Sequence, residues 1–205
     1  MATAYGIEIE GSEGHQKSVQ EVLKKIASNP VGTVILIAMA STKKRATILP
    51  FDKVKAATTS ECNAGALPND PHDAAPDGVR GEQRGASWYK GNQQNPHKQM
   101  PYMEGRGTGL GSDTKVWFSP DILEKAPCAG RGPGSASDEA LLHELVHALR
   151  HMQGLLNPHP TEDGMIGYLN EEEFLAIVAT NVYISASRAH PSERTTQTTT
   201  RCIRR

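Results

Sequence analysis

The sequence predicts one α+β domain with a small sheet, a helix that carries the candidate site and a second helix that folds back against it. Short segments rich in β-branched residues accompany a helical pattern near the start of the chain, and two longer helical patterns follow near its end. The 205 residues suffice for one compact domain with a core. We expect this domain to span 1–188, with a long loop at 54–112 and a poorly ordered tail at 189–205.

The composition limits the partners of the chain. Lys and Arg number 22 against 23 Asp and Glu, so no basic field attracts nucleic acid or an anionic membrane. The three cysteines are widely separated and form no metal or redox motif. The N-terminus has no Sec-type signal, and the apolar run at 31–40 is about half the roughly 20 residues of a membrane helix. We expect synthesis in the cytoplasm and no binding of nucleic acid or membrane.

The first elements follow from hydrophobic spacing. The alternating segment "YGIEIEG" (5–11) predicts a short strand, and 15–28 predicts a helix that ends before Asn29, Pro30 and Gly32. The residues at helical spacing in that helix are Val19, Val22, Leu23 and Ile26. The β-branched segments at 33–40 and 45–51 predict two further strands, which "STKK" joins as a hairpin.

The middle of the chain, 54–112, is dense in Gly, Pro, Asn, Asp and Ala and predicts a long loop. Its end, "GRGTGLGSD" (105–113), does not fit a phosphate loop, because no strand precedes it and no Gly-Lys-Ser/Thr follows. We interpret it as a flexible hinge or turn. The segment "TKVWFSP" (114–120) predicts the next strand.

The clearest helix covers 135–153. Ser135 or Ser137 suits its N-cap, acidic residues follow in the first turn, and Gly154 comes after the last turn. Its buried stripe is predicted to be Leu142, Leu145, Val146 and Leu149. A second helix is predicted at 171–187, where three glutamates open the pattern.

The stretch "HELVH" (143–147) lies on the first of these helices. His143 and His147 are one turn apart on the same face, a separation that one Zn²⁺ with Zn–N bonds of roughly 2.1 Å bridges. Glu144 follows the first histidine and is placed to reach a water without occupying a ligand position. The competing interpretation is an ordinary amphipathic helix, but ordinary residue usage produces this motif by chance in about one such chain in a hundred.

A zinc site needs a third ligand. The longer metzincin motif requires Gly at 150 and His at 153, where this chain has Arg150 and Gln153. His151 lies another turn away and is interpreted as a surface or supporting residue. Better candidates are the acids that open the second helix, Glu171, Glu172 and Glu173, although Glu173 also matches a capping box with Asn170. Weaker candidates lie in the connection: His159, Glu162 and Asp163.

Three segments together resemble a known family. They are "GLGSDTKVWFSPD", "ALLHELVHALRHMQG" and "NEEEFLAIVATNVY", and they are similar to the NleD-like zinc metallopeptidases, effectors of type III or type VI secretion. "HELVH" with a later Glu-Glu-Phe is also similar to clostridial neurotoxin light chains, which share the zincin plan. The resemblance implies a zincin-like fold with one Zn²⁺ per chain on His143, His147 and Glu173. It implies Glu144 as general base and Glu172 as a supporting residue or alternative ligand.

The resemblance also implies a strand beside the cleft that pairs with extended substrate, and 115–121, with Val116, Trp117 and Phe118, is expected to be that strand. The chain departs from its relatives after the second helix. Candidates there for stabilising the transition state are Tyr183 and Arg188.

The motif and the resemblance predict a zinc-dependent endopeptidase, which we expect to be a monomer. The resemblance alone implies a bacterial effector that a specialised secretion system secretes. The resemblance implies a protein substrate in the target cell, with a host signalling kinase as one candidate. Two alternatives belong to other classes: a catalytically impaired zincin-fold binding module, and a non-proteolytic zinc amidase. An α+β interaction protein would bind no metal.

Overall fold

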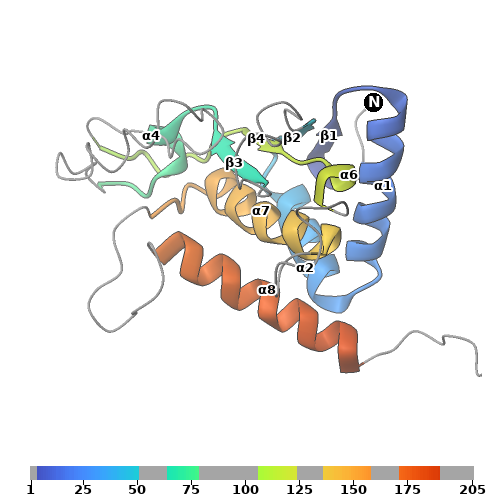
Figure 1. Ribbon diagram of the computed structural model, residues 1–205. Helices are drawn as coiled ribbons and strands as arrows, with labels where there is room; N and C mark the ends of the chain where they lie inside the picture. The colour runs from blue at the N-terminus through green and yellow to red at the C-terminus, as the bar shows by residue number, and fades with distance from the viewer. Residues whose placement is uncertain (1–3, 51–63, 79–105, 124–135, 158–170, 190–205) are drawn as a thin grey trace, which may run out of the picture.

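Helix α7 (Ser137–Met152) lies at the centre of the fold, with a small sheet on one side and helix α8 (Glu171–Ala189) on the other (Figure 1). The computed structural model describes residues 4–50, 64–78, 106–123, 136–157 and 171–189. The predicted tail beyond residue 189 lies outside these ranges. The architecture is α+β, as the sequence predicts.

The sheet has four strands in the order β1-β2-β4-β3. The strands are β1 (Ile7–Ile9), β2 (Ala46–Leu49), β3 (Gly65–Pro68) and β4 (Thr114–Trp117). β1, β2 and β4 pair in parallel, and β3 pairs antiparallel with β4. The strands predicted at 5–11, 45–51 and 114–120 are confirmed, but β3 belongs to the stretch predicted as loop. β3 and a short helix α4 (Pro71–Ala74) occupy its described part, while 51–63 and 79–105 are not described.

The prediction of a strand at 33–40 is wrong, because these residues form helix α2 (Pro30–Ser41). The Asn29 side chain accepts hydrogen bonds from the backbone N–H groups of Val31 and Gly32, and Pro30 takes the first helical position. The buried residues of α2 recur at helical spacing: Gly32, Ile35, Leu36 and Met39. The predicted hairpin is therefore absent, and β2 pairs with β1 instead.

The first helix is confirmed as α1 (Glu13–Ala27), with Ser12 as its N-cap and Val19, Val22 and Ile26 buried. Two short elements complete the described chain: a 3-10 turn η1 (Ala4–Gly6) and helix α6 (Pro120–Leu123). None of the described helices is by itself long and apolar enough to cross a membrane. Only α1 and α2 together reach the required length, across a bend of 112°.

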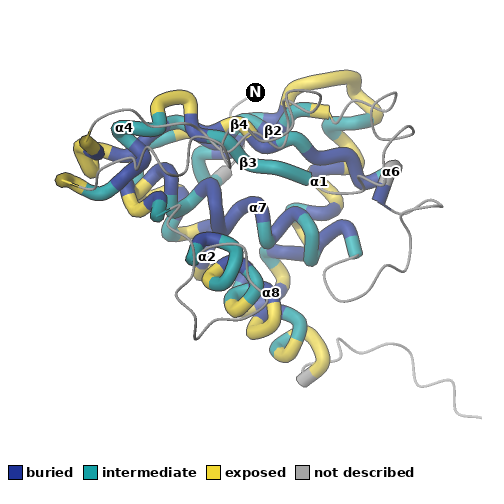
Figure 2. The backbone as a smooth tube through the Cα atoms, turned by 60° about the vertical axis from the view of Figure 1, so that its left-hand side comes forward, coloured by how far each residue is buried: buried dark blue, intermediate teal, exposed yellow. Residues whose placement is uncertain are grey.

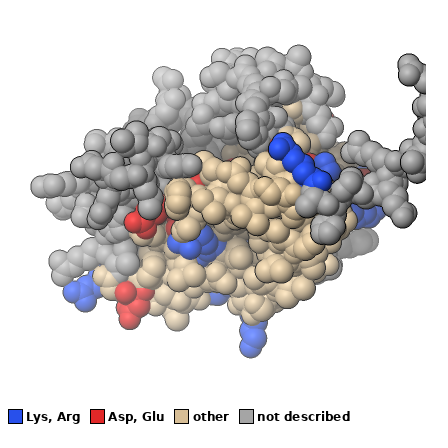
Figure 3. All heavy atoms as spheres, turned by 90° about the horizontal axis from the view of Figure 1, so that it is seen from below, with Lys and Arg blue, Asp and Glu red and all other residues tan. Residues whose placement is uncertain are grey.

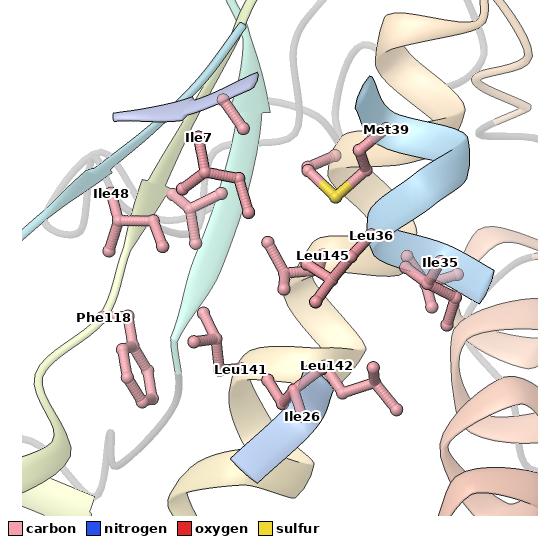
Figure 4. Close-up of a cluster of buried hydrophobic side chains, with 14 of the residues drawn as sticks. Ile7, Ile26, Ile35, Leu36, Met39, Ile48, Phe118, Leu141, Leu142 and Leu145 are labelled. Carbon is pink, nitrogen blue, oxygen red and sulfur yellow. The ribbon is translucent and has the colours of Figure 1, made fainter. Parts of the chain in front are cut away.

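The hydrophobic core joins the sheet, α7 and α2 (Figure 4). Leu141, Leu142 and Leu145 of α7 lie between Ile7, Ile48 and Phe118 of the sheet layer and Leu36 and Met39 of α2. Each such side chain contributes about 1.5–3 kcal/mol when fully buried. Figure 2 shows α7 buried along most of its length. The helix that carries "HELVH" is thus fixed from both sides.

The end of α7 is held by close backbone packing. Gly154 has φ +70°, and the N–H groups of Gly154 and Leu155 donate to the carbonyls of His151 and Arg150, which forms a Schellman motif. The stop predicted at Gly154 is confirmed. Gly111, with φ +74°, approaches so closely that a Cβ there would lie 2.0 Å from the Met152 carbonyl oxygen. The described part of the turn predicted at 105–113, residues 106–113, therefore packs against the end of α7.

The start of α7 differs from the prediction. Its N-cap is Ala136, which makes no side-chain capping bond, and Ser137 is already helical. Ser135 is not described.

Seen from the α8 side, the surface carries only scattered charged side chains (Figure 3). The described residues on this face show no cluster of Lys and Arg.

Candidate metal centre

Two imidazoles converge on the flank of α7. His143 and His147 are four residues apart, and their Nε2 atoms are 3.1 Å from each other. Their rings meet edge to face, with centroids 4.8 Å apart. The side chains are 21% and 10% exposed, so both imidazoles are largely shielded from solvent.

Glu173, in the first turn of α8, supplies the third donor. Its Oε2 lies 3.3 Å from His143 Nε2, and its Oε1 lies 3.5 Å from His147 Nε2. Tetrahedral bonds of about 2.05 Å place ligand atoms about 3.3 Å apart, which is close to the Nε2–Nε2 separation and to the distance from each Nε2 to its nearer Glu173 oxygen. When each residue offers a single ligand atom, the three atoms lie within 4.8 Å of one another. Two imidazole nitrogens and one carboxylate oxygen form a donor set that zinc accepts. The residues present therefore fit a divalent metal ion.

The charges around His147 favour a cation. Burial alone would lower the pKa of His147, but hydrogen bonds to Glu172 and Glu173 and the negative charge of Glu144 raise it to about 10. Burial would raise the pKa of Glu173, yet hydrogen bonds with His143 and His147 hold it well below its usual range. Without a metal, a proton on imidazole balances the carboxylates, and a metal ion would replace that positive charge.

Glu144 is placed differently from Glu173. It is 8% exposed and does not belong to the group of ligand atoms. Its carboxylate accepts a hydrogen bond from the backbone N–H of Ala66 in β3. Burial is the largest influence on this carboxyl and raises its pKa, against the opposing effect of His147 and His143. A carboxylate beside the metal position with a raised pKa is suited to accept and return a proton.

Glu172 and Glu171 point elsewhere. Glu172 is 1% exposed and forms an ion pair with Arg150, while its Oε2 lies 3.8 Å from Nδ1 of His147, on the side of the ring opposite the ligand atom. Glu171 accepts a hydrogen bond from the Asn157 side chain. Of the three consecutive glutamates, the structure brings Glu173 to the two Nε2 atoms. The capping partner Asn170 is not described.

Tyr183 and Arg188 are not brought to this group. The Tyr183 hydroxyl donates to Asp138 Oδ2 at 2.7 Å, and the side chain is 1% exposed in the core. Arg188 lies fifteen residues after Glu173 in the same helix, about 22 Å along its axis. The structure places neither side chain with the three ligand atoms, so a part in stabilising the transition state stays a prediction for both.

The expected substrate strand lies inside the sheet. β4, which contains Val116 and Trp117, pairs with β2 on one side and β3 on the other. Phe118 follows β4, with its N–H bonded to the Leu49 carbonyl and its side chain fully buried. β4 is an inner strand, so it has no free edge for a substrate. Among the described strands, β3 forms the edge beside α7 and contacts Glu144.

Of the remaining candidates, the structure describes His151 alone. His151, interpreted as a surface or supporting residue, is buried, and the ligand group does not include it. His159, Glu162 and Asp163 lie outside the described residues.

Two neighbours of the site were not predicted from the sequence. Arg150 follows His147 at a helical spacing of three, a weak signal, and Ala66 lies in a Gly/Pro-rich stretch that gave none.

A family model described as "Effector protein", of the M91 peptidases, matches residues 3–178. Comparison with curated proteins gave no match, and neither did comparison with solved structures. Because the family model covers well over half of the chain, the chain belongs to the M91 family of NleD-like effector metallopeptidases.

Proposed function

We propose that the chain is a zinc-dependent endopeptidase that acts as an effector on a protein of a target cell. The convergence of His143, His147 and Glu173, with Glu144 beside them, carries this proposal. Membership in an effector peptidase family supports a protein substrate. Bacterial origin, a host signalling kinase as substrate, specialised secretion and a monomeric chain belong to the same proposal and do not follow from the site geometry.

His143, His147 and Glu173 would hold one Zn²⁺, which supplies Lewis-acid polarisation of the scissile carbonyl and lowers the pKa of water. Glu144 takes the proton of the attacking water and later returns it to the leaving amine. The Ala66 N–H orients the Glu144 carboxylate in the resting protein. Glu172 keeps His147 oriented from the Nδ1 side.

The edge of the sheet suggests how an extended substrate is aligned. β3 borders α7, and no described strand pairs with its outer side. An extended peptide beside β3 would bring its carbonyl groups toward Glu144 and the three ligand atoms. We therefore assign the role predicted for 115–121 to β3.

The first test is the zinc content per chain, measured by elemental analysis on wild type, Glu173→Ala and Glu172→Ala. We expect about one zinc in wild type, loss of zinc in Glu173→Ala, and weakened but detectable binding in Glu172→Ala, because only Glu173 faces both Nε2 atoms. A wild type that holds no zinc after incubation with Zn²⁺ would return "HELVH" to an ordinary amphipathic helix.

The second test is proteolysis by wild type and Glu144→Gln. Gln fills the same space but accepts no proton, so this variant should keep its zinc and lose cleavage by ~100-fold or more. The measurement is the appearance of new protein N-termini, identified by mass spectrometry, in a eukaryotic cell lysate. Zinc without new termini in wild type would favour the binding-module or amidase alternatives. Substantial cleavage by Glu144→Gln would refute its role as base.

A further inference from the structure

Glu172 is a buried carboxylate with several donors around it. Arg150 Nε lies 2.8 Å from Oε2 and 3.0 Å from Oε1, and Arg150 Nη2 lies 2.8 Å from Oε1. The backbone N–H of Asn157 donates to Oε1 at 2.6 Å. A 1% exposed carboxylate held by a guanidinium fork and a backbone donor has one defined position.

Arg150 also holds the chain that follows α7. Its Nη2 donates to the Leu155 carbonyl at 2.6 Å, and its own carbonyl accepts from the Leu155 N–H at 2.8 Å. The Arg150 side chain is only 20% exposed. One residue therefore connects the last turn of α7, the segment Leu155–Asn157 and the first turn of α8.

Glu172 is next to two of the three candidate ligands, His147 and Glu173. Glu172 Oε2 lies 3.8 Å from Nδ1 of His147, whose Nε2 is one of the three converging ligand atoms. Glu172 also precedes Glu173 in the same helical turn, so fixing one sets the backbone from which the other extends. A carboxylate behind a ligand histidine typically changes metal affinity by about 10- to 100-fold.

We propose that Arg150 is a positioning residue for the metal centre: it holds Glu172 behind His147 and thereby sets the orientation of both His147 and Glu173. This inference rests on the proposed function, because it requires a metal at the three ligand atoms. The competing explanation is a structural ion pair, whose loss leaves a buried charge and lowers stability without changing the site.

The experiment measures the affinity for Zn²⁺ alone, by competition with a chromophoric chelator, and the urea unfolding of the metal-free chain. The variants are Arg150→Met, Arg150→Lys and the double variant Arg150→Met with Glu172→Gln. Arg45→Met is the matched control, because Arg45 forms an ion pair with Glu8 at 2.9 Å on the exposed surface.

We expect Arg150→Met to weaken zinc binding by about 10- to 100-fold and Arg45→Met to change it by less than about twofold. Arg150→Lys should restore part of the affinity, since it keeps the charge without the fork. The double variant should be more stable than Arg150→Met, because the buried charge is gone, yet bind zinc equally weakly. If Arg150→Met does not fold, Arg150→Lys and the double variant give the same comparison.

The outcomes separate the inference from the proposed function. Wild-type zinc affinity in a folded but less stable Arg150→Met would make the contact purely structural and overturn the inference, while the proposed function would stand. Absence of zinc from wild type would remove both. Weak zinc binding in the double variant, at restored stability, is the result that supports a positioning role.

Discussion

The Tyr183 hydroxyl ties α8 to the start of α7. It donates to Asp138 Oδ2 at 2.7 Å, while Asp138 Oδ1 lies 2.6 Å from Lys25 Nζ of α1. Burial and the neighbouring carboxylate of Asp138 hold the pKa of Tyr183 well above its usual range, so the hydroxyl stays neutral and keeps donating. Tyr183, a candidate for stabilising the transition state, thus joins three helices.

Tyr183→Phe should lower the free energy of unfolding by about 2 kcal/mol, because a buried hydrogen bond to a carboxylate is lost. The catalytic efficiency of the folded variant should stay within about twofold of wild type, since the ring lies outside the metal centre. Urea denaturation and peptidase kinetics check the two parts. A ~100-fold loss of kcat in a folded variant would restore the catalytic role.

Lys25→Met is the control for this prediction. Its ammonium contacts the same Asp138, but the Lys25 side chain is 64% exposed. Exposed ion pairs contribute about 0–1 kcal/mol, so this substitution should cost clearly less than Tyr183→Phe. Equal losses in the two variants would mean that the aromatic hydroxyl has no special part in holding α8.

At the scale of elements, local signals explain what the sequence predicts well. α1 and α7 combine helical spacing with an acidic residue in the first turn, so local and long-range preferences agree. The sequence predicted a strand where α2 lies because apolar residues occur all around this helix. They show no clear helical spacing, so the β-branched residues were the stronger signal. The Asn29 cap and the burial of one face stabilise the helix at these residues. β3 was missed because Gly65, Ala66 and Pro68 are poor strand formers that pairing with β4 overrides.

The candidate site likewise has a part that the sequence predicts and a part that it does not. His143, Glu144 and His147 lie within five residues, so helical geometry alone predicts their arrangement. Choosing Glu173 over its neighbours depends on how α8 is rotated, and that rotation follows from the burial of Glu172 against Arg150. The contact from Ala66 to Glu144 joins residues far apart in sequence. No spacing rule predicts such a contact.

The joint between α2 and α8 depends on Asn29. Its Oδ1 caps α2, and its Nδ2 donates to the Tyr183 carbonyl at 3.1 Å and to Ser187 Oγ at 2.7 Å. Asn29→Ala should lower the free energy of unfolding by about 2–3 kcal/mol, since a cap and buried bonds are lost together. Urea denaturation measures the change.

Ser12→Ala is the matched control for Asn29→Ala. Ser12 caps α1 through one exposed hydrogen bond from the His15 N–H at 3.3 Å and does not reach α8. Its loss should cost about 0.5–1 kcal/mol. If the two variants lose equal stability, capping alone accounts for Asn29 and the joint to α8 contributes nothing.

At the scale of the whole molecule, the three ligand atoms connect two layers. His143 and His147 belong to α7, whose other faces pack into the core, whereas Glu173 belongs to α8 on the outside of the fold. A metal ion would therefore join an outer helix to the buried one. α8 is also attached without a metal, through Tyr183, Asn29 and the ion pair of Glu172 with Arg150.

Removal of zinc by a chelator should lower the melting temperature without unfolding the chain at 25 °C. The loss of stability follows RT ln(1 + [L]/Kd), about 4 kcal/mol where free zinc is a thousandfold above Kd. The fold should persist because the buried leucines of α7 keep their contacts with the sheet and α2. Calorimetry with and without chelator measures the shift, and far-UV circular dichroism measures the helix content.

Glu173→Ala is the control: it should melt at the same temperature with and without chelator, since its metal site is incomplete. A wild type that unfolds completely on chelation would mean that the core cannot hold α8 in place, and an unchanged melting temperature would mean that no metal joins the two helices.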